Sequence, residues 1–125
     1  MTRQLRLTVG SVALTLDLKD TPTAEAIWNA APFEAPVNTW GDEIYFSTPV
    51  TVAEEPDARD VMELGEIAYW RPGKALAIGF GPTPASRGDE IRLAGPCNVF
   101  ATCSDDLAQL KTVLDGTKAR VEAIV

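Results

Sequence analysis

The sequence YWRPGKALAIGF, residues 69–80, predicts two β-strands joined by a tight turn. Pro72 and Gly73 are typical of turns, because proline presets a turn backbone and glycine tolerates conformations that other residues avoid. The flanking runs at 67–70 and 75–80 are short apolar segments bounded by turn residues, as strands are. The rest of the predicted fold is arranged around this pair of strands.

The preceding stretch, NTWGDEIYF from Asn38, predicts more strand structure. It is read as two strands over 37–40 and 43–52, or as one strand bent at residues 41–42. Because side chains of a strand alternate between its faces, one face belongs to the core and the other does not. Ile44 and Phe46 share one face of the strand, and Tyr45 and Ser47 share the other.

The N-terminal residues predict a β-hairpin followed by a helix. Apolar residues alternate with polar ones over 5–9 and 12–18, on both sides of a turn that begins with Gly10. This period of two is typical of a hairpin with one buried face. Thr21 is then a favourable helix cap, and Pro32 ends the helix. The core-facing stripe follows helical spacing and contains Ala24, Ile27, Trp28 and Ala31.

The remaining chain predicts two polar loops and several short elements. The acidic stretch at 53–60 is expected to be a solvated surface loop, and residues 81–89 a long polar loop. The later elements are a short edge strand at 90–93, a strand at 97–103, a helical turn capped by Ser104 that carries Leu107, Leu110 and Leu114, and a last strand at 118–125.

These elements predict a mainly β fold: about eight short strands in an antiparallel barrel or closed sandwich, with one main helix and a short C-terminal helical turn. Full closure of the barrel removes exposed strand edges. The 125 residues fall in the commonest size range for one domain, so residues 1–125 are expected to form a single domain.

Composition excludes several classes of partner. The formal net charge is −7, and a surface that acidic repels a phosphate backbone, so no nucleic acid is expected. No apolar run approaches the roughly 18 residues of a membrane helix, and the N-terminus lacks the apolar core of a signal peptide. We therefore expect a cytoplasmic protein without a membrane partner.

The chain contains no histidine, which removes Ser-His and Cys-His nucleophile pairs and zinc sites that use histidine. Cys97 and Cys103 are expected to be reduced, because six residues of one extended strand separate them by roughly 20 Å. The carboxylates lack the spacing of a calcium loop. The sequence thus predicts no metal and no cofactor.

Several motifs resemble the cyclophilins. The helix start at 21–27 is similar to their Pro-x-Thr-Ala-Glu-Asn-Phe segment, and the C-terminal segment around Leu107, Leu110, Asp115, Gly116 and Val121 resembles their last helical turn and strand. Essentially the whole chain is similar to a small prokaryotic cyclophilin-like family of uncharacterised function. The motifs that carry this resemblance are Asn38 to Gly41 with Glu43 to Phe46, then Gly65, Tyr69, Trp70, Pro72 to Leu76, Gly81, Thr83 and Pro84.

The resemblance implies a closed eight-stranded cyclophilin-like barrel with no established activity. Peptidyl-prolyl isomerisation is one alternative, and in true cyclophilins it uses an arginine that would fall near residues 37–39 of this chain. No arginine occurs between Arg6 and Arg59. Arg71 stands where the family is expected to have a second proline. Without an arginine near residues 37–39, the positive charge needed to stabilise the twisted amide has no obvious source.

The favoured hypothesis is a non-catalytic module that binds a small molecule or a proline-containing peptide. Aromatic walls, polar side chains and rigid turns are the usual composition of such a site. The alternative is a protein-interaction subunit, because exposed tryptophans often mark interfaces, and the oligomeric state stays open. The candidate binding residues are Asn38, Trp40, Tyr45, Trp70, Arg71, Lys74, Phe80 and Thr83.

Overall fold

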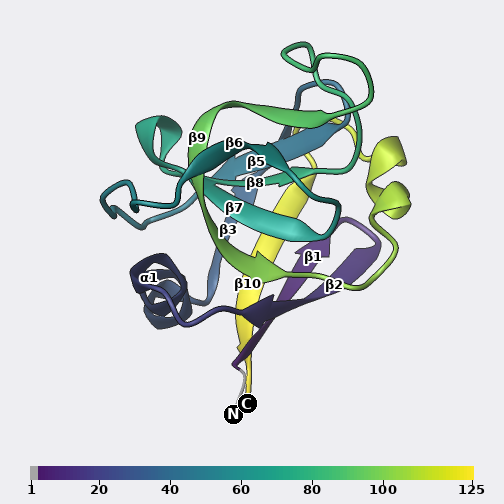
Figure 1. The fold of residues 1–125 in the computed structure, drawn as a ribbon. Coiled ribbons are helices and arrows are strands. Elements are labelled where there is room, and N and C mark those ends of the chain that lie inside the picture. Colours follow the sequence, from purple (N-terminus) through teal and green to yellow (C-terminus); the bar gives the residue numbers. More distant parts are fainter. Residues whose placement is uncertain (1–2) are drawn as a thin grey trace.

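The computed structural model describes residues 3–125, which form an antiparallel β-fold with one α-helix (Figure 1). The predicted mainly β class is therefore confirmed. The strands are β1 Gln4–Val9, β2 Val12–Leu18, β3 Phe33–Pro36, β4 Asn38–Thr39, β5 Glu43–Ser47, β6 Arg59–Met62, β7 Glu66–Trp70, β8 Ala75–Gly79, β9 Ile91–Thr102 and β10 Lys118–Ile124. The helices are α1 Pro22–Ala30 and the short 3₁₀ turns η1 Arg71–Gly73 and η2 Leu107–Thr112.

The sheet is nearly closed into a barrel. Its strand order is β3-β10-β1-β2-β9-β7-β8-β5-β4, with β6 attached to β9 outside this path. The two end strands, β3 and β4, are consecutive in the chain and are separated only by Val37, which is buried. A single bent segment thus supplies both ends of the sheet.

The structure has more strands than the sequence predicted. Within residues 3–125 the sheet contains ten strands, against the expected eight. One addition is β3, which follows Pro32 directly and pairs with β10. The other is β6, which begins in the last two residues of the stretch expected to be an acidic loop and pairs with the first half of β9. Both form because a partner strand distant in sequence offers unpaired backbone groups, a signal that local composition does not carry.

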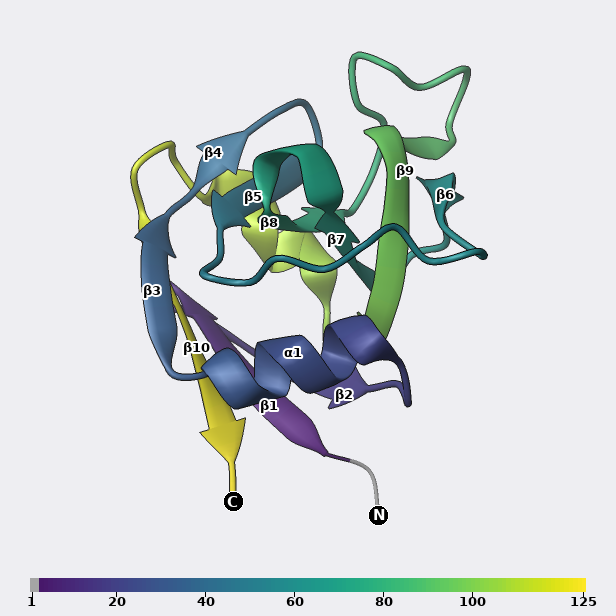
Figure 2. The same ribbon diagram turned by 90° about the vertical axis from the view of Figure 1, so that its left-hand side faces the viewer.

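The N-terminal hairpin and the helix are confirmed. In the hairpin, Val9 pairs with Val12 across a turn in which Gly10 has φ +58°. In α1 the Thr21 side chain accepts a hydrogen bond of 3.1 Å from the Ala24 amide. Figure 2 shows α1 packed against one side of the barrel, where Ile27 is completely buried.

Three strands are buried on both faces. Inside the barrel, β5, β7 and β8 contribute the large side chains of the main core, namely Ile44, Phe46, Ile67, Tyr69, Leu76 and Ile78. On their outer face a second cluster forms with β6 and the first half of β9, from Met62, Ala68, Ala77, Leu93 and Cys97. At this place the chain therefore covers the outside of the barrel.

Three local predictions were wrong. The cap of η2 is Asp106, whose side chain accepts a hydrogen bond of 3.0 Å from Ala108, rather than Ser104. Leu114 is not part of the helical turn, because η2 ends at Thr112, and its side chain is 75% exposed. Residues 90–93 and 97–103 do not form separate strands either, because 91–102 form the continuous strand β9.

Within the described residues, no helix combines the length and the apolar character needed to cross a membrane.

A buried amide holds the 53–55 segment against the barrel. Asn98 on β9 is 1% exposed; it accepts a hydrogen bond from the Glu55 amide and donates to Thr23 and to the Ala53 carbonyl. The Glu55 carboxylate in turn accepts from Thr23. This network makes part of the expected acidic loop a fixed element.

Replacing Asn98 by alanine should destabilise the fold by about 3 kcal/mol, because each buried polar group left without a partner costs roughly 1–3 kcal/mol. Urea unfolding followed by circular dichroism measures the difference. Asn29→Ala, which truncates an exposed amide on α1, is the matched control and should change stability by less than about 0.5 kcal/mol. Equal effects of the two changes would show that the network contributes nothing.

Candidate functional site

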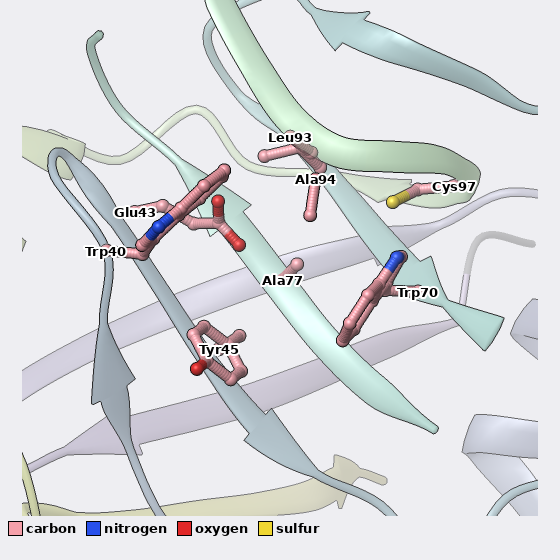
Figure 3. Close-up of a pocket in the computed structure, with 8 residues that line it drawn as sticks. All are labelled: Trp40, Glu43, Tyr45, Trp70, Ala77, Leu93, Ala94 and Cys97. Atoms are coloured by element: carbon pink, nitrogen blue, oxygen red, sulfur yellow. The ribbon is translucent and has the colours of Figure 1, made fainter. Parts of the chain in front are cut away.

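A small pocket opens on the outer face of the barrel, between the sheet and the first half of β9 (Figure 3). Its volume is about 110 Å³. The lining combines three aromatic rings, several small apolar groups, one thiol and one carboxyl group. These residues are Trp40, Glu43, Tyr45, Trp70, Ala77, Leu93, Ala94 and Cys97.

The strand register explains why this space is open. Glu43 and Tyr45 are two residues apart on β5, so both side chains point to the outer face. Directly opposite Tyr45 on β8 is Ala77, and beyond it on β7 is Ala68. Because the central positions carry only methyl groups, the larger side chains around them enclose a cavity instead of filling it.

The η1 turn positions Trp70. A Cβ atom on Gly73 would lie 2.7 Å from the Trp70 ring, closer than real Cβ atoms approach other atoms, so only glycine lets the turn pack against this indole. Lys74 completes the turn with φ +49°. The Pro-Gly pair of the sequence therefore fixes one wall of the pocket.

The second tryptophan is positioned by a tight turn between β4 and β5. The Trp40 amide donates a hydrogen bond of 3.0 Å to the Glu43 carbonyl, and Gly41 has φ +62°. The Asp42 amide donates to Pro82, and the Asp42 carbonyl accepts from Phe80. Figure 3 shows Trp40 and Trp70 on opposite sides of the pocket, with the Glu43 carboxyl group and Ala77 between them.

The carboxyl group of Glu43 is buried without compensation. The residue is 5% exposed, and its Oε1 atom has no hydrogen-bond partner within residues 3–125. Burial raises the pKa of Glu43 from its usual 4.5 to about 7. Across the pocket, burial and then the nearby Glu43 charge raise the pKa of Cys97 to about 12, so this thiol stays protonated at neutral pH.

Three of the eight predicted binding residues, Trp40, Tyr45 and Trp70, lie together in this pocket. The structure places the other five outside the lining. Asn38 is exposed on β4, and Arg71 and Lys74 are exposed in the η1 turn. Phe80 packs against the main core. Thr83 is buried, and its hydroxyl donates to the Arg92 carbonyl.

The sequence interpretation missed the acidic member of the site. Glu43 had a usable signal, because it stands two residues before Tyr45 and so shares its face of the strand. Leu93, Ala94 and Cys97 had no such signal, since β9 reaches the pocket only through pairing with β6 and β7. No group of three or more metal-ligating side chains gathers anywhere in residues 3–125.

Comparison with known proteins agrees with this architecture. The family model described as cyclophilin-like matches residues 3–122. The chain belongs to the cyclophilin-like family. It is similar to the solution structure of the hypothetical protein AF2241 from Archaeoglobus fulgidus, with a TM-score of 0.83 and 39% sequence identity over 98% of this chain and 95% of that one. A search of curated proteins found no match. The resemblance noted in the sequence is thus confirmed.

The burial of Glu43 in this cyclophilin-like chain has a consequence for stability. Between pH 4.5 and about 7 the folded chain retains a proton that the unfolded chain has released, so stability falls as the pH rises through this window. Since one pKa unit corresponds to about 1.4 kcal/mol, the ionised group costs the fold about 3 kcal/mol above pH 7.

Glu43→Gln should therefore leave stability nearly unchanged at pH 5 and raise it by about 2–3 kcal/mol at pH 8.5. Urea unfolding at the two pH values measures the difference between variant and wild type. Glu54→Gln removes an exposed carboxylate and is the matched control, expected to show no such pH dependence. A Glu43→Gln difference that is the same at both pH values would contradict the raised pKa.

Proposed function

We propose that this cyclophilin-like chain is a non-catalytic binding module that holds a small ligand, or one side chain of a peptide, between Trp40, Tyr45 and Trp70. The observation that carries the proposal is the buried Oε1 atom of Glu43, which lies in the lining of an open pocket and has no partner within residues 3–125. Buried polar atoms are nearly always paired, and an unpaired one costs about 1–3 kcal/mol. A bound group that donates a hydrogen bond removes this cost.

The size of the pocket limits what enters it. Pockets for whole drug-sized ligands measure roughly 300–1,000 Å³. The volume here is about 110 Å³, which suits one head group or one side chain. The rest of the ligand would then lie on the surface near Ala94, which is exposed and lines the pocket.

The character of the lining favours binding over prolyl isomerisation. The isomerisation hypothesis needs a positive charge to stabilise the twisted prolyl amide, and the eight lining residues include neither lysine nor arginine. The charged group they do provide is the carboxyl of Glu43. Arg71, the cation adjacent to Trp70 in sequence, is exposed and lies outside the lining.

The test is a fragment titration followed by the indole N–H signals of the three tryptophans in a ¹⁵N NMR spectrum. The panel contains small amines, amides, carboxylates, neutral alcohols and a proline dipeptide. Some fragments should shift the Trp40 and Trp70 signals but not Trp28, which packs on α1 away from the pocket. No shift at Trp40 or Trp70 with any fragment would overturn the proposal.

Ala94→Leu should weaken the binding of these fragments about tenfold, equivalent to about 1.4 kcal/mol, because a larger side chain enters the pocket. Ala94 is exposed, so the fold should tolerate the change. Ala108→Leu, at an exposed position of η2, is the matched control and should leave binding unchanged. If the fragments bind Ala94→Leu and Ala108→Leu with equal affinity, they bind outside this pocket.

A further inference from the structure

We propose that the group held in this pocket is an organic cation of the alkylammonium class, enclosed by the rings of Trp40, Tyr45 and Trp70 and paired with the carboxylate of Glu43. This inference rests on the proposed binding function and adds to it the charge and chemical class of the ligand. It follows from the aromatic walls, the unpaired carboxyl oxygen and the distribution of charge around the pocket.

The aromatic walls suit a cation. The faces of aromatic rings carry negative potential, tryptophan most strongly, and they attract ammonium groups that lie against them. Here the rings come from three separate segments: Trp40 precedes β5, Tyr45 is on β5 and Trp70 ends β7. The two indoles lie on opposite sides of the cavity with Tyr45 on a further side (Figure 3). Three rings on different sides can surround a compact group, whereas a single ring would contact only one side of it.

The carboxyl group supplies the counter-charge. Glu43 is the charged member of the lining, and no salt bridge involves it within residues 3–125. A buried carboxylate without a cationic partner is unfavourable, and a bound ammonium group with an N–H or a positive charge next to Oε1 corrects this. An anionic ligand is opposed by the same carboxylate and by the ring faces.

Two other classes fit less well. A divalent metal ion needs several oxygen ligands, and Glu43 is the single carboxylate of the lining. A neutral amide could donate to Oε1, but it gains little from three aromatic faces. An alkylammonium group uses both features, because its alkyl carbons are apolar and its charge is spread over them.

Binding of a cation should also depend on pH. Glu43 must be ionised to pair with it, and burial raises the pKa of this group to about 7, so affinity should fall as the pH drops below 7. The other titratable groups near the pocket are Tyr45 on the same strand and Cys97 on β9, with Asp60 of β6 and Glu54 close enough to influence Cys97. Burial raises the pKa of Cys97 to about 12, so its thiol does not change charge in this range.

The test compares choline with 3,3-dimethylbutan-1-ol, which has the same shape but no charge. Each is titrated into the protein at pH 8 while the indole signals of Trp40 and Trp70 are followed by NMR. Choline should bind at least about tenfold more tightly than the alcohol. Its affinity should fall about tenfold between pH 8 and pH 6, as the ionised fraction of Glu43 falls.

Glu43→Gln should remove the pH dependence of choline binding and reduce the preference for choline, while Glu54→Gln, the exposed control, retains both. Trp70→Leu keeps an apolar wall but removes the aromatic ring. It should therefore lower the affinity for choline and leave the affinity for the alcohol nearly unchanged. Proton NMR dispersion confirms that each variant is folded. These responses would not follow from a purely structural role of either residue.

The outcomes separate the two proposals. If choline and the alcohol shift Trp40 and Trp70 with equal affinity, the pocket binds ligands and the cation inference is wrong. The cation inference is also wrong if neutral or anionic members of the fragment panel bind there and choline does not. If nothing in either experiment shifts these two signals, the binding function itself is wrong.

Discussion

The structure depends on the burial of both faces of β5, β7 and β8. Inside the barrel these strands carry the large residues of the main core, and outside β7 and β8 carry alanines beneath β6 and the first half of β9. A strand whose two faces are both mainly apolar needs a cover on its outer face, and another part of the chain must supply it. Twelve-residue β9 supplies it by pairing with β7 through one half and with β6 through the other.

That cover also creates a feature of the core that opposes stability. Glu43 occupies an outer position of β5, and without β9 above it the carboxyl group would be solvated. Under β9 it is 5% exposed, next to a thiol and three aromatic rings, with an oxygen that no group within residues 3–125 satisfies. Strain of this kind is typical of functional sites, where a ligand rather than the protein completes the interaction.

The turns hold this arrangement in place. Gly73 allows the η1 turn to pack against the Trp70 ring, and Gly41 with its positive φ directs Trp40 to the opposite side. Both glycines stand in the motifs that relate the chain to the cyclophilin-like family. Their physical role here is to fix two indoles at a separation that leaves a cavity, so the same residues that define the fold also shape the site.

The sequence by itself determined the β class, the N-terminal hairpin, the helix capped by Thr21 and the family, because each depends on local periodicity or on a contiguous motif. It also named Trp40, Tyr45 and Trp70, which the structure brings to one pocket. Only the tertiary structure decided that Glu43 is buried beside them, while Lys74 and Thr83 are not part of the lining. Burial depends on which distant strand covers a face, and the pairing of β6 with β9 has no local signature in either segment.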